Sequence, residues 1–263
     1  MNIVVLTKLV PDTEARLSIS GDRVNLSGVE LVVSPFDEYG LEEAIRIKEA
    51  SEGTTVYALM VGPEAGRKQI VNCLALGADE AIVIDDPAIT GSDPHALARV
   101  LVGEIKKLEP AVVFAGKQGV DYDWGLTPIA VAAQLGWPHV GVVKEFKPDF
   151  GAGTFTAVTE SDEGDLTFAG TLPVVVTAEK GLNTPRYASL KGIMGAKKKP
   201  FNVHKLADTG VDAAQVGPEA ATVEEVKASH PPERPAGRII EGDDLSQVVA
   251  ELVRALREEA RVI

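Results

Sequence analysis

Short, uninterrupted apolar runs that alternate with amphipathic patterns constrain the fold of this chain most. Four runs of strand length occur early in the chain, at Ile3–Leu6, Val56–Met60, Ala81–Ile84 and Ala111–Phe114. None alternates strictly with polar residues, as expected of parallel strands that are buried on both faces. Helical patterns lie between them, at Phe36–Ala50, Ala65–Leu76 and Pro94–Leu108. The alternation predicts an α/β fold with a doubly wound parallel sheet over residues 1–140.

The pattern changes after Trp137–Pro138. Short runs separated by glycines predict antiparallel hairpins at Val140–Phe146, Thr154–Thr159 and Asp165–Phe168. A further buried strand is expected at Leu172–Ala178, with Pro173 among its first residues. We therefore expect one α/β domain over residues 1–205, which includes the hairpins and a loop at 182–199, and a C-terminal segment over 206–263.

The C-terminal segment is expected to be an extended arm that ends in a helix. Gly217–Asp244 is rich in Pro, Gly and Glu, which is typical of an arm. A helix with one apolar stripe is predicted after Asp244, formed by Leu245, Val248, Val249, Leu252, Val253 and Leu256. The stripe packs either on the chain's own core or on a partner.

The charge and cysteine content exclude several classes of protein. A net charge of −13 and a pI near 4.8 argue against binding to nucleic acid or to a membrane surface, which requires a basic face. A single cysteine, Cys73, permits no intrachain disulfide and is expected to be a buried, inert thiol. The N-terminal residues resemble no targeting segment and no run is long enough to span a membrane, so we expect a cytoplasmic protein.

Ligands of a doubly wound sheet bind beyond the carboxyl ends of its strands, where helix N-termini present free N–H groups. Three such junctions are Leu6–Lys8, Ser34–Asp37 and Val61–Pro63. At the second junction, Ser34 is a candidate N-cap, Pro35 fits the first helical position, and Asp37 is placed for a capping box. An ordinary helix start explains that junction equally well.

The fourth junction, at residues 116–124, is the most polar. Its two glycines, Gly116 and Gly119, permit a backbone nest for a phosphate, Lys117 offers a neutralising charge, and Gln118 or the aspartates offer bonds to a ribose or a base. The familiar nucleotide-hydrolysing, dinucleotide and hydrolase motifs are missing from the sequence, and its four histidines lack metal-ligand spacing. The sequence therefore predicts a nucleotide that is bound and not turned over.

The stretch from Leu182 to Lys199, here called the docking loop, is basic in an acidic chain. From Lys180 to Lys199 there are six basic residues and no acidic one, interleaved with apolar side chains. A basic rim accelerates encounter with an acidic partner, while a few apolar side chains supply most of the affinity. The alternative is a covered loop with a helical turn at Ser189–Ala196 and a solvated lysine run.

Three segments resemble the electron transfer flavoprotein beta subunit. The most specific is Leu182–Leu190 followed by Gly192–Pro200, and the others are Asn2–Asp12 with Val33–Asp37 and Gly116–Asp123. The stretch from Val158 through Gly164 to Leu172–Thr177 agrees as well, so the resemblance covers essentially the whole chain. It implies a subunit without a catalytic site of its own, in a heterodimer that carries electrons. The alpha subunit holds most of the FAD, and the beta subunit buries AMP. Electrons pass from acyl-CoA and related flavin dehydrogenases of fatty acid oxidation to a membrane quinone oxidoreductase.

The resemblance also implies roles for individual residues. The AMP positions fall on Leu6, Ser34, Pro35, Phe36, Asp37, Val61, Gly116, Lys117, Gln118, Gly119, Val120, Asp121, Tyr122, Asp123, Trp124, Gly125, Leu126 and Thr127. Thr13 falls near the flavin, and Glu160 pairs with an arginine of the alpha subunit. In the docking loop Leu190 is the anchor side chain, and the other partner-binding residues are Arg186, Tyr187, Ile193, Met194, Lys197 and Lys198.

The sequence departs from the family pattern at two places. Gly125–Pro128 stands where members commonly have a polar pair followed by Thr-Gly, and the side chain of Leu126 cannot form a hydrogen bond. Lys191 replaces a frequent proline in the docking loop. Two further readings remain open: an electron-bifurcating relative with a second FAD in the AMP site, and a stand-alone nucleotide-sensing module.

Overall fold

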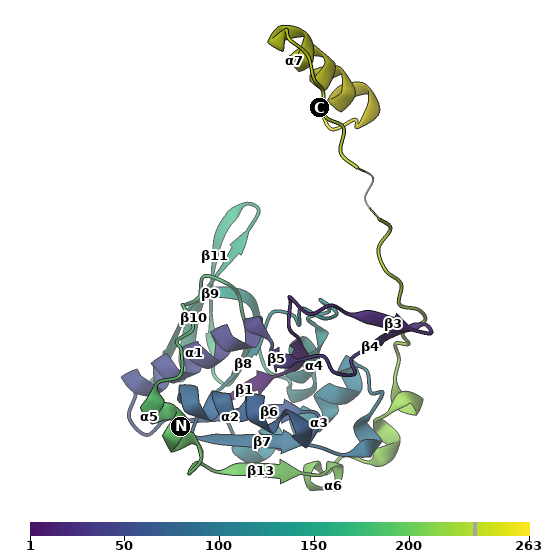
Figure 1. The fold of residues 1–263 in the computed structure, drawn as a ribbon. Helices are drawn as coiled ribbons and strands as arrows, with labels where there is room; N and C mark the ends of the chain where they lie inside the picture. The colour runs from purple at the N-terminus through teal and green to yellow at the C-terminus, as the bar shows by residue number, and fades with distance from the viewer. Residues whose placement is uncertain (234–235) are drawn as a thin grey trace. The chain divides into compact units, whose positions relative to one another are not determined.

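The computed structural model describes residues 1–233 and 236–263, and these fall into two compact units, 1–226 and 227–263. In the described part of the chain the first unit is built on a nine-stranded sheet (Figure 1). From one edge to the other its strands are β11 (Gly164–Thr171), β10 (Thr154–Ser161), β9 (His139–Asp149), β12 (Val174–Ala178), β8 (Val112–Gly116), β1 (Asn2–Thr7), β6 (Thr55–Val61), β7 (Glu80–Ile84) and β13 (Phe201–His204).

The centre of the sheet is parallel, which confirms the predicted fold class. β1 pairs in parallel with β6 on one side and β8 on the other, and β12 pairs in parallel with β8 and β9. Every residue of β8 and of β12 is buried. Their uninterrupted apolar sequences follow from this, because helices cover a parallel sheet on both faces.

Four helices cover the two faces of the sheet. Side chains of α1 (Pro35–Ala50) and α2 (Arg67–Leu76) pack with Ile3 and Val5 of β1, whereas α3 (Pro94–Leu108) and α4 (Leu126–Leu135) pack with Val4 and Leu6. Successive strand residues point to opposite faces, so one strand supplies both cores. The positions and periods of α1, α2 and α3 agree with the sequence pattern.

The hairpins expected after residue 138 are present. β9, β10 and β11 form an antiparallel ribbon, and the register of β10 with β11 ends at the pair Ser161 and Gly164. Figure 1 shows β10 and β11 projecting from the end of the sheet. β12 begins at Val174, so Pro173 lies just before the strand and not within it.

Several short elements were not anticipated. They are β13, the ribbons β2 (Leu9–Pro11) with β5 (Leu31–Val33) and β3 (Ser18–Ser20) with β4 (Arg23–Asn25), the helix α6 (Leu206–Thr209), and single turns at Glu64–Gly66, Pro87–Ile89, Ala213–Gln215 and Pro218–Ala220. The helix α5 (Leu190–Ala196) lies where the alternative for the docking loop places a helical turn. The first unit continues past the boundary expected after residue 205, because Leu206 and Val216 are buried in the core beneath α3.

The second unit contains α7 (Leu245–Arg254), which continues as a π-helical turn at Ala255–Glu259. The Asp244 carboxylate caps the helix by accepting a hydrogen bond from the N–H of Ser246. The apolar stripe of α7 is exposed at Leu245, Val249, Leu252 and Val253. Among the described residues, no helix has the length and hydropathy that crossing a bilayer requires.

Gly103 of α3 provides a test of the packing, because we expect its replacement by alanine to destabilise the protein, whereas a change from glycine to alanine usually stabilises a helix. Alanine ordinarily stabilises a helix relative to glycine by about 1 kcal/mol. A Cβ at Gly103 would lie 2.3 Å from the carbonyl oxygen of Thr209 in α6. We expect Gly103→Ala to lower the free energy of unfolding by about 1–3 kcal/mol, measured by urea denaturation. Gly195→Ala in α5 is the control, because no atom lies within 4 Å of its Cβ position; equal stability of the two variants would contradict this packing.

Candidate functional site

A pocket of about 250 Å³ lies at the carboxyl ends of β1, β6 and β8. Its lining includes many of the predicted nucleotide residues: Leu6, Asp37, Val61, Gly116, Gln118, Gly119, Asp121, Tyr122, Trp124, Gly125, Leu126 and Thr127. Ser34, Pro35, Phe36, Lys117, Val120 and Asp123 lie outside the lining. All four junctions thus contribute to one cavity, the second through Asp37 alone, because the carboxyl ends of neighbouring parallel strands meet at one edge of the sheet.

Asp37 is the most constrained polar group of the pocket. One carboxylate oxygen accepts the N–H of Lys8 and the other accepts the N–H of Gly116, both at 2.8 Å. The predicted capping box is therefore wrong: this carboxylate joins the ends of β1 and β8 and does not turn back on its own helix. Burial raises the pKa of Asp37 from 3.8 to about 7, against the lowering effect of the two backbone hydrogen bonds.

The other residues of this junction support the start of α1. Ser34 occupies the N-cap position and Pro35 the first helical position, as predicted. The Ser34 side chain makes no capping hydrogen bond, and its buried Oγ has no partner in the described part of the chain. The Phe36 ring lies beneath the ammonium group of Lys117, 5.0 Å from it.

The loop after β8 divides its polar groups between the pocket and its surroundings. Lys117, the charge that the sequence suggested, pairs with Glu179 at 2.5 Å and lies outside the lining of the pocket. Lys8 is the only Lys, Arg or His in the described lining, and its ammonium group pairs with Asp121 at 2.6 Å. The Gln118 amide donates to Asp123 at 2.7 Å.

Besides α1, the N-termini of α3 and α4 meet the pocket, and these two differ in how they are capped. Asp93 caps α3 through the N–H of Ala96. α4 begins after Gly125, which adopts a left-handed conformation with φ 59° and has no side chain to cap the first N–H groups. The exposed backbone donors and the positive end of the α4 dipole are therefore available to an anion.

α3 contributes a wall of the pocket that the sequence analysis missed. Its residues there are Pro94, Leu97 and Leu101; Ser92, just before the helix, and Leu59 of β6 also line the pocket. The sequence does contain a signal for this helix start, because Asp93 followed by Pro94 is a typical N-cap and first helical position.

Residues 217–225 fasten onto the rim of the pocket. The N–H of Gly217 donates to Ser92 Oγ, and both the N–H and the hydroxyl of Thr222 donate to Asp93, each at 2.7 Å. The Tyr122 hydroxyl donates to Glu225 at 2.9 Å, and the Tyr122 ring lies 5.0 Å from that of Trp124. This segment of the chain therefore holds the aromatic side of the pocket in place.

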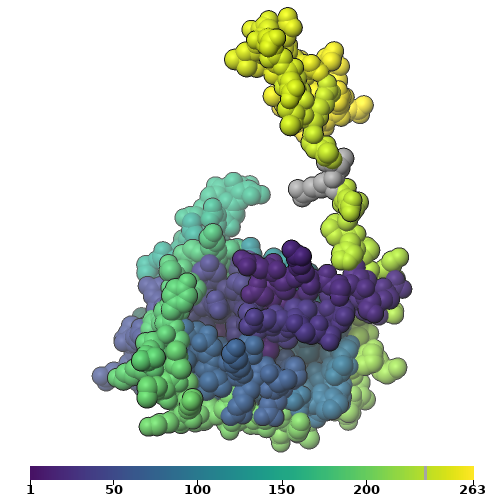
Figure 2. Space-filling view, in the orientation of Figure 1, coloured from purple at the N-terminus to yellow at the C-terminus, as the bar shows by residue number. Residues whose placement is uncertain are grey.

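The docking loop lies at the surface, in green in Figure 2, and its apolar residues are exposed. Tyr187 is 97% exposed, Leu190 78% and Met194 68%, with Ile193 also exposed. The alternative of a covered loop therefore fails for these side chains, although the helical turn at Ser189–Ala196 is present as α5, capped by Ser189 Oγ.

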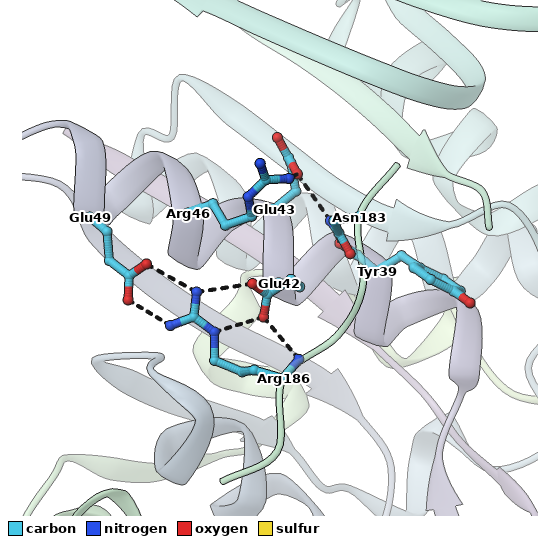
Figure 3. Close-up of polar contacts among 7 residues, drawn as sticks. All are labelled: Tyr39, Glu42, Glu43, Arg46, Glu49, Asn183 and Arg186. Carbon is cyan, nitrogen blue, oxygen red and sulfur yellow. Dashed lines mark hydrogen bonds and ion pairs between the residues drawn. The ribbon is translucent and has the colours of Figure 1, made fainter. Parts of the chain in front are cut away.

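Two basic residues of the loop, Lys199 and Arg186, bind other parts of the chain and are not part of a solvated basic rim. The Lys199 ammonium group donates to the carbonyl oxygens of Leu74 and Ala78 at the end of α2, and burial lowers its pKa. The Arg186 guanidinium is bound to carboxylates of α1 (Figure 3). Lys197 and Lys198 lie in the turn after α5 and form no ion pair within the described residues.

Thr13 and Glu160 lie away from the pocket. Thr13 is exposed in the turn after β2, and Glu160 is exposed near the end of β10, opposite Asp165. In the described residues no cluster of His, Cys, Asp and Glu could hold a metal ion. Cys73 is buried as expected, and burial raises the pKa of its thiol to about 12.

The bridge formed by Asp37 gives a pH-dependent prediction. An asparagine side chain at this position would offer one acceptor oxygen in place of two, so we expect Asp37→Asn to cost about 1–3 kcal/mol near pH 5.5. The folded-state pKa of Asp37 is raised from 3.8 to about 7, so the stability it contributes is lost as pH rises through about 7. The difference in unfolding free energy from wild type should narrow between about pH 5.5 and 7.5 and then level off.

Urea denaturation across this pH range measures that difference. Asp22→Asn, at an exposed position, controls for the loss of one negative charge. A difference that stays constant or widens toward high pH would show that Asp37 does not titrate in this way.

The sequence is similar to proteins of one known family over most of its length. Residues 23–209 match the family model described as the electron transfer flavoprotein domain. The chain is 35% identical to the electron transfer flavoprotein subunit beta of Bacillus subtilis, with 100% of each chain covered. It is 35% identical to the subunit of the same name from Methylophilus methylotrophus, with 98% of each covered. It is 31% identical to the caffeyl-CoA reductase-Etf complex subunit CarD of Acetobacterium woodii, with 98% of this chain and 99% of that one covered. The chain therefore belongs to the electron transfer flavoprotein family, as a beta subunit.

Proposed function

We propose that this beta subunit binds AMP in the pocket and pairs with an alpha subunit that holds FAD. The heterodimer would carry electrons from flavin dehydrogenases, such as acyl-CoA dehydrogenases, to a membrane quinone oxidoreductase. The single observation that supports this proposal best is the pocket itself, where an uncapped helix N-terminus and one lysine face an apolar wall.

The residues of the pocket fit a mononucleotide. The N–H groups at the start of α4 and the Lys8 ammonium group would hold the phosphate, because a helix N-terminus with a nearby cation favours an anion. The apolar side, which includes Leu97 and Leu101, would take the base. Leu126 contributes to this grip through its backbone, so its lack of a polar side chain does not remove the anion site.

The size of the pocket favours AMP over FAD. Ligand pockets commonly measure about 300–1,000 Å³, so a pocket of about 250 Å³ is small. FAD contains an adenine nucleotide joined to a second, larger half, whereas AMP fills a single-nucleotide site. Residues 217–225 close one side of the rim through Tyr122 and Ser92, which leaves less space for an extension.

The specific alternative is an electron-bifurcating complex with a second FAD in this pocket. It is favoured by the 31% identity to CarD, which is named as a subunit of a caffeyl-CoA reductase-Etf complex. For that ligand the rim formed by residues 217–225 would have to open. AMP is the simpler occupant of the pocket as it stands.

The contacts with the alpha subunit are proposed for three parts of the chain. Thr13 would approach the flavin, and the exposed Glu160 would pair with an arginine of the alpha subunit. The arm and α7 would complete the interface, because the exposed stripe with Leu245 and Leu252 requires an apolar partner surface.

Extraction of nucleotides from the heterodimer, co-expressed with its alpha subunit, tests the ligand by mass spectrometry. We expect one AMP and one FAD per heterodimer, and two FAD would establish the bifurcating alternative. Lys8→Met should weaken AMP binding about tenfold, as expected for the loss of a charged hydrogen bond, whereas Lys106→Met on the exposed end of α3 should not.

Leu190 tests the docking role. An exposed apolar anchor that becomes buried at an interface commonly contributes about 2 kcal/mol or more, so Leu190→Ala should raise the KM for the dehydrogenase about thirtyfold. The FAD content should not change. Leu26→Ala, at another exposed leucine outside the loop, is the matched control. Equal kinetics for wild type and Leu190→Ala would remove Leu190 from the interface.

A further inference from the structure

We propose that Arg186 is a positioning residue, which clamps the docking loop to α1 and thereby fixes the surface that Tyr187, Leu190 and Met194 present. In this role it does not touch the partner protein. The inference rests on the proposed docking function of the loop and assigns to Arg186 a different task from the partner contact expected from the sequence.

The guanidinium of Arg186 is occupied by two carboxylates of α1 (Figure 3). Its Nε and Nη2 donate to the two oxygens of Glu42 at 2.8 and 2.9 Å, which is a bidentate pair. Its Nη1 and Nη2 donate to the two oxygens of Glu49 at 2.6 and 3.0 Å. Four of the five N–H donors that an arginine carries are thus used within the chain, so little of this group remains for a partner.

Because Glu42 is buried, its carboxylate depends on Arg186 as a partner. The side chain of Glu42 is only 8% exposed, and it also accepts the backbone N–H of Arg186 at 3.2 Å. A buried carboxylate requires a partner that satisfies its charge and its acceptors. Arg186 meets that requirement in a fork geometry that lysine cannot reproduce.

The clamp holds a segment that has no other regular structure. Residues 183–189 form neither helix nor strand. Asn183 adds a second point on α1, where its amide donates to the carbonyl oxygen of Tyr39 at 2.9 Å and to Glu43 at 3.0 Å. Side-chain bonds to α1 therefore replace the backbone ladder that would otherwise order this stretch.

The far end of the loop is held on α2 and not on α1. A Cβ at Gly192 would lie 2.2 Å from the carbonyl oxygen of Ala75, so α5 approaches the α2 backbone as closely as glycine allows. Lys199 then holds the end of the loop, because its ammonium group donates to the carbonyl oxygens of Leu74 in α2 and of Ala78 just after it. Tyr187 and Leu190 lie between the end of the loop that is held on α1 and the end that is held on α2. The Arg186 clamp fixes the end on α1.

A fixed loop binds a partner more tightly than a loose one. The entropic cost of ordering a fixed loop arises when the chain folds, so it does not reduce the affinity for the partner. A clamp therefore affects the KM for the dehydrogenase and not the turnover of bound complex. Direct contact of Arg186 with an acidic partner predicts a similar effect for loss of the arginine itself. The clamp and the direct contact differ in the effect that they predict for loss of the Glu42 charge on the KM.

Glu42→Gln in the complete heterodimer separates the two roles. If Arg186 is a clamp, Glu42→Gln loosens the loop and raises the KM for the dehydrogenase about threefold to tenfold, as Arg186→Met does. If Arg186 contacts an acidic partner, Glu42→Gln frees the guanidinium and removes a nearby negative charge, so the KM falls or stays the same. The kcat and FAD content should equal those of wild type in the clamp case.

Hydrogen–deuterium exchange of residues 183–196, in the heterodimer without dehydrogenase, tests the clamp independently of docking. Exchange should be faster in Arg186→Met and Glu42→Gln. Glu49→Gln, at a more exposed carboxylate, is a milder variant that should shift exchange in the same direction if the others fold poorly. Arg99→Met, whose native Nη1 donates to the carbonyl oxygen of Gln215, is the control for loss of an arginine elsewhere.

Unchanged exchange in Arg186→Met and Glu42→Gln would overturn the clamp. Faster exchange with an unchanged KM, in these variants and in Leu190→Ala alike, would instead overturn the docking function on which the inference rests. Faster exchange with a raised KM in Glu42→Gln is the result that supports the inference.

Discussion

The carboxylate of Asp37 is the interaction on which the functional part of the molecule depends. It accepts the backbone N–H groups of Lys8 and Gly116, and these are the residues at which the chain leaves β1 and β8. Parallel strands leave their terminal donors unpaired where the chains diverge, and an unpaired buried donor is costly. One carboxylate satisfies both donors, fixes the distance between the two strand ends, and thereby shapes the floor of the pocket.

The same residue lies in the first turn of α1, and this connects the pocket to the docking loop. α1 continues to Glu42 and Glu49, whose carboxylates bind Arg186. The helix is buried along much of its length against β1 and β8, so its two ends cannot move independently. The pocket and the docking loop are thus positioned by one helix, although their residues are far apart in sequence.

Much of the fold and part of the site followed from the sequence. The buried parallel strands and the helices between them were readable because burial on both faces removes polar residues from a strand. Residues placed by long-range pairing were not readable. Lys117 appeared to be the pocket cation, yet Glu179, about 60 residues later, binds it and leaves Lys8 in that place. β13 was missed because a short, half-buried edge strand has no apolar run.

Long-range pairing also redistributes the charge of the docking loop. Five basic residues in the loop of a chain with net charge −13 suggest a broad cationic patch, but Arg186 is neutralised by two glutamates and Lys199 binds the carbonyl groups of Leu74 and Ala78. Lys191, Lys197 and Lys198 have no ion pair among the described residues. Exposed charges act over roughly a Debye length, about 8 Å at physiological salt. In the docking role that we propose, steering of a partner would therefore depend on these three lysines, whereas Arg186 and Lys199 bind other parts of the chain.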